Sequence, residues 1–190
     1  MIPAWNNSGL LPPIRQNKPG HDSNRSPYLV ELHQVVERFT LSKERIAILQ
    51  GLFDYRKALH ALGIEHGFQW LDGSFMEQVE ILEDRPPNDI DVVTFYHLPA
   101  GMDQRSLAAR NIDLFSPERT KEIYKVDAYT CILGEPTAAW HVKKIAYWYS
   151  MWSHRRNGIW KGFLQVDLAP HGDLSAIKTL ELVQQEGGQS

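Results

Sequence analysis

The chain has 190 residues, of which 43% are hydrophobic and 23% charged, the composition of an ordinary soluble domain that can build a core. Its net charge of −3 lacks the basic excess of broad nucleic-acid binders, whereas a small phosphorylated ligand needs only a local positive pocket. One cysteine excludes an internal disulfide, no apolar run is long enough to cross a bilayer, and no signal peptide is evident, so we expect a cytoplasmic protein without membrane contact.

Residues 1–27 are rich in Pro, Asn, Gly and Ser and have no regular hydrophobic period. They are interpreted as an extended N-terminal arm, and the apolar run at 9–14 predicts that this arm docks on the remainder, 28–190, which forms one domain. Ser26-Pro27 indicates the start of a helix that ends near residue 39.

Further along the chain, the patterns alternate between helix and strand. Ser42 is expected to cap a second helix and Gly63 to end it. Strands are predicted at 68–71, 90–95, 126–133 and 162–168, and helices from Ser116-Pro117, over 137–152 and after a cap at Asp173. The order predicts an α+β fold with a mixed β-sheet flanked by helices.

The segment Asn88-Asp89-Ile90-Asp91 carries the most informative chemistry. Alternate residues of a strand point to the same face, so Asp89 and Asp91 project together. Such crowded carboxylates are unfavourable unless a cation neutralises them, and oxygen-only ligands suit Mg²⁺ or Mn²⁺. Asp127, an isolated charge in the next predicted strand, is the candidate third ligand; alternatively, it is an edge-strand charge that discourages aggregation.

Gly73-Ser74 follows the strand at 68–71 and supplies a candidate phosphate-binding turn. Glycine lets backbone amides approach a phosphate closely, and Ser74 can donate a further hydrogen bond. Asp72 is interpreted as a cap of the short helix after this turn rather than a metal ligand. Lys161 either binds triphosphate or acceptor, or belongs to a basic turn in solvent; for Arg155 and Arg156 the solvent interpretation leads.

An aromatic group accompanies the late helix and turn, and it could stack on bases. A packed face or a partner interface is the leading interpretation, because several members recur at helical spacing. The group comprises Trp140, Tyr147, Trp148, Trp152 and Trp160. The eight histidines show no ligand spacing.

Gly-Ser followed by Asp-hydrophobic-Asp resembles the signature of the DNA polymerase β-type nucleotidyltransferase superfamily. The chain is also similar to a bacterial family of small uncharacterised nucleotidyltransferase-like proteins. These have a Met-Ile-Pro…Gly-Leu-Leu-Pro-Pro arm, a Leu-Asp-Gly-Ser-Phe turn and a late Lys-Gly-hydrophobic strand. The matching segments here are Met1–Pro3, Gly9–Pro13, Leu71–Phe75 and Lys161–Phe163. This closer likeness covers nearly the whole chain.

The resemblance implies a nucleotidyltransferase-like fold and metal-dependent transfer of a nucleoside monophosphate from an NTP to a hydroxyl on protein, RNA or a small molecule. By position, Gly73 and Ser74 would hold phosphates, Asp89 and Asp91 would bind both metals, and Asp127 would complete the set. Related minimal transferases occur in toxin–antitoxin and phage-defence modules, which predicts a protein partner or an RNA acceptor. The alternative is a non-catalytic nucleotide-binding or scaffold subunit of such a module.

Overall fold

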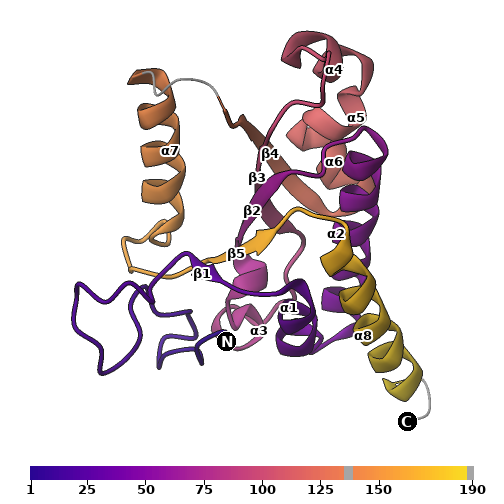
Figure 1. Ribbon diagram of the computed structural model, residues 1–190. Helices are drawn as coiled ribbons and strands as arrows, with labels where there is room; N and C mark the ends of the chain where they lie inside the picture. Colours follow the sequence, from indigo (N-terminus) through magenta and orange to yellow (C-terminus); the bar gives the residue numbers. More distant parts are fainter. Residues whose placement is uncertain (135–138, 188–190) are drawn as a thin grey trace.

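A five-stranded sheet runs through the centre of the computed structural model, which describes residues 1–134 and 139–187 (Figure 1). The spatial order is β1-β5-β2-β3-β4. The strands are β1 (Tyr28–Leu29), β2 (Gly67–Asp72), β3 (Ile90–Tyr96), β4 (Val126–Ile132) and β5 (Leu164–Asp167). β2 is antiparallel to β3 and β5, whereas the β3–β4 and β1–β5 pairs are parallel. The predicted α+β class with a mixed sheet is therefore confirmed.

Helices cover both faces of the sheet, but unequally. Figure 1 shows α7 alone on one side and the helices α1, α2, α5, α6 and α8 on the other. The helices are α1 (Leu32–Phe39), α2 (Lys43–Ala61), α3 (Val79–Leu82), α4 (Gln104–Arg110), α5 (Ile112–Phe115), α6 (Pro117–Tyr124), α7 (Ala139–Trp152) and α8 (His171–Gly187), with a 3-10 turn, η1 (Ser74–Met76). Within the described part of the chain, no helix combines the length and the apolar character needed to cross a membrane.

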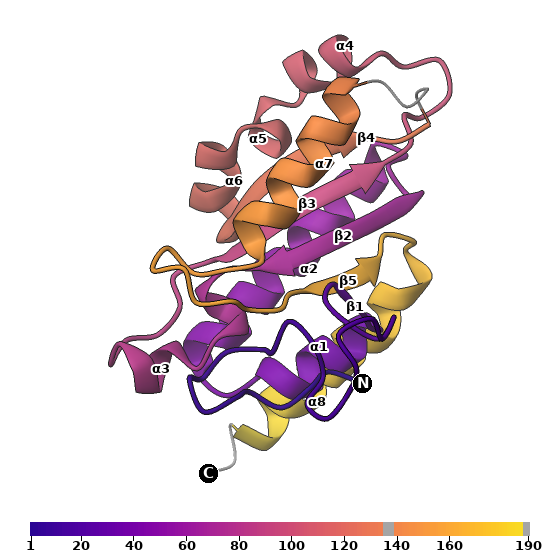
Figure 2. The same ribbon diagram turned by 90° about the vertical axis from the view of Figure 1, so that its left-hand side faces the viewer.

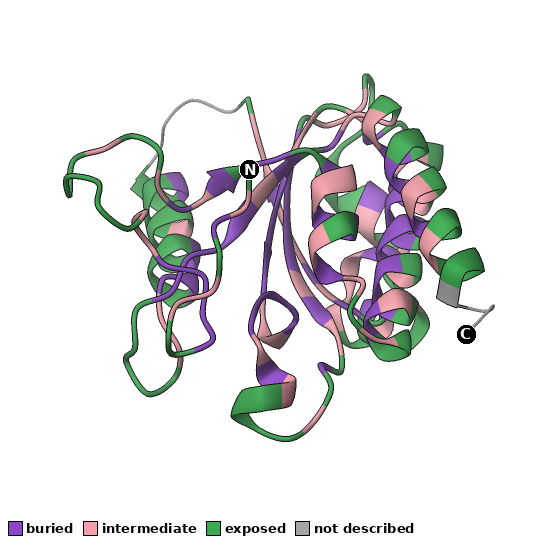
Figure 3. Ribbon diagram, turned by 90° about the horizontal axis from the view of Figure 1, so that it is seen from below, coloured by how far each residue is buried: buried purple, intermediate pink, exposed green. Residues whose placement is uncertain are grey.

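The two faces of the sheet contribute to two separate cores, as expected from strand alternation. In β3, Ile90 and Val92 belong to the larger core beneath the five helices, whereas Val93 and Phe95 belong to a smaller core. That smaller core contains Trp148 from α7. Figure 3 shows the buried strands lying between these layers.

The helix predicted from Ser26-Pro27 begins later than expected. Tyr28–Leu29 forms β1 at the sheet edge, and α1 starts at Leu32. The backbone N–H of Tyr28 donates to the Phe163 carbonyl at 2.9 Å, and the Ser26 hydroxyl accepts from the Phe163 N–H at the same distance. Pairing with a strand far along the chain therefore takes the backbone groups that a helix would have used.

Most other predicted elements are present with small shifts of their ends. Ser42 accepts a hydrogen bond from the Arg45 N–H and caps α2, and Gly63 follows that helix with φ +77°. Strands β2 to β5 and helix α6 lie where they were predicted, while α4 and α5 were not anticipated. The predicted start of α7 at 137 lies outside the described residues.

Asp173 does not cap the last helix, which corrects the expectation from the sequence. Helix α8 begins earlier, at His171, and Asp173 is buried. Its carboxylate accepts hydrogen bonds from Arg56 at 2.6 and 3.0 Å. A fully buried guanidinium needs such a counter-charge, and this requirement outweighs capping.

The N-terminal segment lies against the domain, as a docked arm requires. Leu10 and Leu11 are each 1% exposed. The Leu11 carbonyl accepts from the Gly162 N–H at 2.7 Å, and the Trp5 indole donates to the Met76 carbonyl at 2.7 Å. These contacts connect the arm to both ends of the segment that carries the predicted site.

Candidate metal and nucleotide site

Three aspartates form a row across one end of the sheet. Asp91 of β3 pairs directly with Asp72 of β2 on one side and with Asp127 of β4 on the other. Paired residues of neighbouring strands point to the same face, so these carboxylates share the α7 side of the sheet. Asp89 precedes Asp91 by two residues and lies on the same side. Asp127 therefore faces the first pair, as the metal-site prediction requires.

All six residues predicted for the site line one pocket of roughly 640 Å³. The fold therefore brings together the turn after β2, the start of β3, β4 and the segment before β5. The pocket is lined by Asp72, Gly73, Ser74, Glu77, Glu83, Arg85, Asn88, Asp89, Asp91, Lys121, Asp127, Met151, Trp152, His154, Arg155, Arg156, Asn157 and Lys161.

Gly73 is required by both its conformation and its surroundings. Its φ of +86° is one that side-chain-bearing residues rarely adopt. A Cβ at this position would lie 1.9 Å from Oδ2 of Asp91. The turn that starts at Gly73 is therefore in contact with the central carboxylate of the row. The start of such a helical turn presents backbone N–H groups without partners inside the turn, which suits an anion.

Burial and mutual repulsion make the carboxylate row electrostatically unfavourable. Burial, reinforced by the charges of Asp127 and Asp89, raises the pKa of Asp91 to about 6. Burial also raises the pKa of Asp72 to about 7, even though the Lys161 charge opposes it. The row holds negative charge most favourably when a cation lies against it.

Lys121 of α6 provides one such cation, which no sequence pattern indicated. Its ammonium lies 2.7 Å from Oδ2 of Asp89 and 3.7 Å from Oδ2 of Asp127. The hydrogen bond with Asp89 raises the pKa of Lys121. Half of this side chain is exposed, at 51%, so it is free to swing away from the carboxylates.

The donor set fits a hard divalent cation once Lys121 moves. No group of three or more His, Cys, Asp or Glu side chains within residues 1–134 and 139–187 is arranged to hold a metal ion as the side chains stand. The Lys121 ammonium instead bridges Asp89 and Asp127. Carboxylate oxygens that already attract an ammonium are also the ligands that Mg²⁺ and Mn²⁺ prefer.

Asp72 is not a helix cap, contrary to the expectation from the sequence. Gly73 occupies the cap position of η1, and the Asp72 carboxylate accepts from the Lys161 ammonium at 2.9 Å. Lys161 also lies 3.2 Å from Oε1 of Glu77, and it is buried rather than part of a solvated turn. Among the described residues, Oδ1 of Asp72 has no hydrogen-bond partner although it is buried. An unpaired buried oxygen of this kind can accept from a ligand that enters the pocket.

Arg155 also departs from the solvent interpretation. Its guanidinium pairs with Glu77 at 3.1 Å and with Glu83. Together with Lys161, Arg155 connects the loop after α7 to the segment that follows Gly73 through ion pairs with Glu77. Arg156 is exposed, as expected, but lies on the pocket wall.

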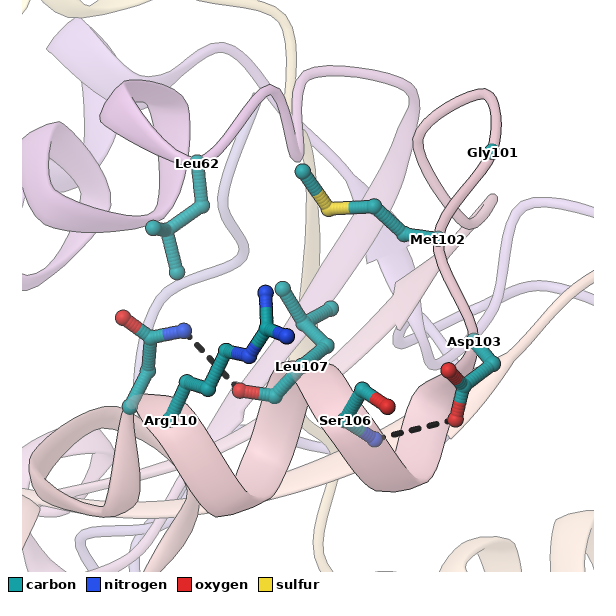
Figure 4. Close-up of a pocket in the computed structure, with 8 residues that line it drawn as sticks. Leu62, Gly101, Met102, Asp103, Ser106, Leu107 and Arg110 are labelled. Atoms are coloured by element: carbon teal, nitrogen blue, oxygen red, sulfur yellow. Dashed lines mark hydrogen bonds between the residues drawn. The ribbon is translucent and has the colours of Figure 1, made fainter.

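A second, smaller pocket of roughly 390 Å³ lies between the end of α2 and α4 (Figure 4). Its wall includes Leu62, Leu107 and Arg110. Figure 4 also shows the Asp103 carboxylate bonded to the Ser106 N–H, at 2.9 Å, so this acid caps α4. This pocket contains none of the predicted site residues.

The model of one protein family, described as a family of unknown function (DUF6932), matches residues 3–167. The chain belongs to the DUF6932 family. The DUF6932 match begins in the arm and ends with β5, so it includes every residue of the larger pocket and leaves out α8. Searches of curated proteins and of solved structures gave no match.

Proposed function

We propose that the protein transfers a nucleoside monophosphate from an NTP to a hydroxyl group with Mg²⁺ or Mn²⁺ as cofactor. One observation carries the proposal: Asp89, Asp91 and Asp127 share a pocket with the Gly73-Ser74 turn. A row of acids alone, or a glycine turn alone, would support no reaction. Their combination matches the needs of a bound metal–triphosphate complex.

Each residue has a defined task in this reaction. Asp89, Asp91 and Asp127 would hold the cations, which when bound neutralise phosphate charge and stabilise the attacking and leaving oxygens. The turn at Gly73 would orient the phosphates through backbone N–H groups, with the Ser74 hydroxyl as a further donor. The acceptor oxygen bonds to the α-phosphorus, the bond from that phosphorus to the bridging oxygen breaks, and pyrophosphate leaves. Asp127 would accept the proton of the attacking hydroxyl.

Lys121 has a place in the same scheme. While its ammonium bridges Asp89 and Asp127, it neutralises part of the charge of the carboxylate row. Binding of a metal–nucleotide complex would release this half-exposed side chain and leave a mobile cation at the pocket wall, where it can contact phosphate oxygens.

The test is incubation of the purified protein with labelled NTP, Mg²⁺ and a lysate as the source of acceptors. We expect labelled product that falls about a hundredfold or more in Asp91→Asn and in Asp127→Asn, since each change removes a carboxylate ligand but keeps its size. Asp54→Asn, on the exposed surface of α2, is the matched control and should retain activity. Equal labelling by wild type and both site variants would refute the proposal.

A second candidate is a non-catalytic nucleotide-binding or scaffold subunit. It is favoured by the two lysines that already pair with the acids, Lys121 with Asp89 and Lys161 with Asp72. This candidate predicts Mg-NTP binding by isothermal titration calorimetry with no label transferred to any lysate component. For the transferase, within a toxin–antitoxin or phage-defence module, we also expect growth arrest on expression that Asp91→Asn abolishes.

A further inference from the structure

The segment from residue 136 to residue 166 differs in charge from the remainder of the chain. It contains no Asp or Glu, although the whole chain has a net charge of −3. Its cations are Lys143, Lys144, Arg155, Arg156 and Lys161. The segment includes α7 and the loop that follows it. Arg155 and Lys161 pair with acids, and the Lys144 ammonium donates to the Thr130 carbonyl, so Lys143 and Arg156 are the exposed cations that it offers to a partner.

Aromatic side chains on this segment divide into a buried and an exposed set. Trp148 and Trp152 pack into the smaller core beneath α7. Tyr147 is 57% exposed and Trp160 is 63% exposed, values that core packing does not explain. The core interpretation of this group is therefore confirmed for the buried set, and the partner-interface interpretation stays a prediction for the exposed set.

The exposed residues form a stripe along α7. Trp140, Lys143 and Tyr147 are spaced at three and four residues, so they stand on one side of the helix. Met151, one further turn along, lies at the wall of the larger pocket. Figure 2 shows α7 lying across the front of the sheet, with its outer side facing away from the strands. The stripe thus leads from the distal end of α7 to the carboxylate site.

We propose that this stripe, with Trp160, is the acceptor-binding surface and that the acceptor is a single-stranded nucleic acid. The inference rests on the proposed function, because the hydroxyl at the end of such a strand would be the attacking group. Exposed rings offer stacking faces to unpaired bases, and Lys143 attracts the phosphate backbone. Bases within a duplex are stacked on each other and cannot use these rings.

The charge of the surface favours this occupant over a second copy of the chain. Two α7 surfaces placed face to face would bring together Lys143 and Arg156 from both copies, and the segment offers no acid to pair with them. An acidic protein or an anionic bilayer would also be attracted to these cations. Neither explains why the aromatic stripe leads into a pocket suited to phosphates.

The experiment is fluorescence anisotropy with labelled single strands of about 12 nucleotides, one of RNA and one of DNA. The corresponding RNA and DNA duplexes are measured in the same way. We expect at least one single strand to bind more tightly than either duplex, and its affinity to fall steeply between about 50 and about 200 mM salt. Tyr147→Ala, Trp160→Ala and Lys143→Glu should each weaken binding about tenfold. Lys178→Glu, the same charge change on the exposed side of α8, should have little effect.

Several outcomes would overturn the proposal. These are tighter binding of the duplex, an equal loss in Lys178→Glu, or preferential binding to polyglutamate or to phosphatidylglycerol vesicles. Mg-NTP binding is measured on the wild type and on the same variants, since none of these three changes removes a proposed metal ligand or phosphate contact. Nucleotide binding without binding of single strands refutes this inference alone. Binding of single strands without nucleotide binding refutes the proposed function, and with it the acceptor role of the strand, but retains the stripe as a binding surface for single strands.

Discussion

Gly73 and Asp91 are coupled at the scale of single residues, because the space that a side chain at position 73 would need is filled by the Asp91 carboxylate. The same carboxylate is flanked in the sheet by Asp72 and Asp127. The site therefore depends on one small residue and on the balance of charge around one acid. Both features lead to direct tests.

Gly73→Ala should lower the free energy of unfolding by about 1–3 kcal/mol and weaken Mn²⁺ binding, because the new Cβ meets Asp91 in a backbone conformation that alanine disfavours. Urea denaturation and Mn²⁺ titration followed by electron paramagnetic resonance measure the two effects. Gly172→Ala is the control, since a Cβ there has no neighbour within 4 Å. A Gly73→Ala protein with wild-type stability and Mn²⁺ affinity would contradict the described turn.

Lys121→Met should raise Mn²⁺ affinity about fivefold, because it removes the ammonium that competes for Asp89 and Asp127. Lys57→Met, on the exposed surface of α2, controls for the change in net charge. Equal or weaker Mn²⁺ binding by Lys121→Met than by this control would show that the lysine does not occupy the cation position.

The pKa of Asp91 predicts a pH dependence of stability. Burial and the neighbouring acids raise this pKa from 3.8 to about 6, so between these values the folded protein binds more protons than the unfolded chain. The metal-free protein should therefore lose stability as pH rises from about 4 to about 6, and Asp91→Asn should remove about 2 kcal/mol of this loss. Urea denaturation with EDTA at several pH values measures it. An unchanged pH profile in Asp91→Asn would contradict the electrostatic account.

At the scale of elements, the sequence predicts those helices and strands that depend on interactions between residues close together in the chain. The capped helix α2, the proline-started helix α6 and the alternating strand β3 all follow from nearby residues. β1 was missed because its partner, β5, is distant in sequence, and Asp72 was misread because its partner Lys161 is equally remote. The shared face of Asp89, Asp91 and Asp127 was predictable because alternate residues of a strand point to the same side. The position of Lys121 beside them depends on how α6 packs against the sheet, so the sequence did not indicate it.

Helix α7 and the loop after it carry both buried and exposed aromatic side chains, which should respond differently to truncation. Trp148→Ala should lower the free energy of unfolding by about 3–5 kcal/mol, since Trp148 is buried against Tyr129 and Trp152. Trp160→Ala should cost less than about 1 kcal/mol, because that side chain is mostly exposed. Equal losses in urea denaturation would contradict the described packing.

At the scale of the whole molecule, the larger helical layer packs on one side of the sheet, whereas the opposite side carries α7, the smaller core and the site. The acid row, the glycine turn and the basic loop after α7 all meet on that opposite side. The DUF6932 match extends over this entire arrangement, from the arm to β5. The larger core thus lies on the side of the sheet away from the ligand site.

The most direct test of the metal site is anomalous diffraction from crystals soaked with Mn²⁺ and a non-hydrolysable NTP. We expect two Mn²⁺ ions in contact with Asp89, Asp91 and Asp127, the triphosphate against Gly73 and Ser74, and Lys121 displaced from the carboxylates. Crystals with no Mn²⁺ at these aspartates, and with Lys121 still bridging Asp89 and Asp127, would contradict it.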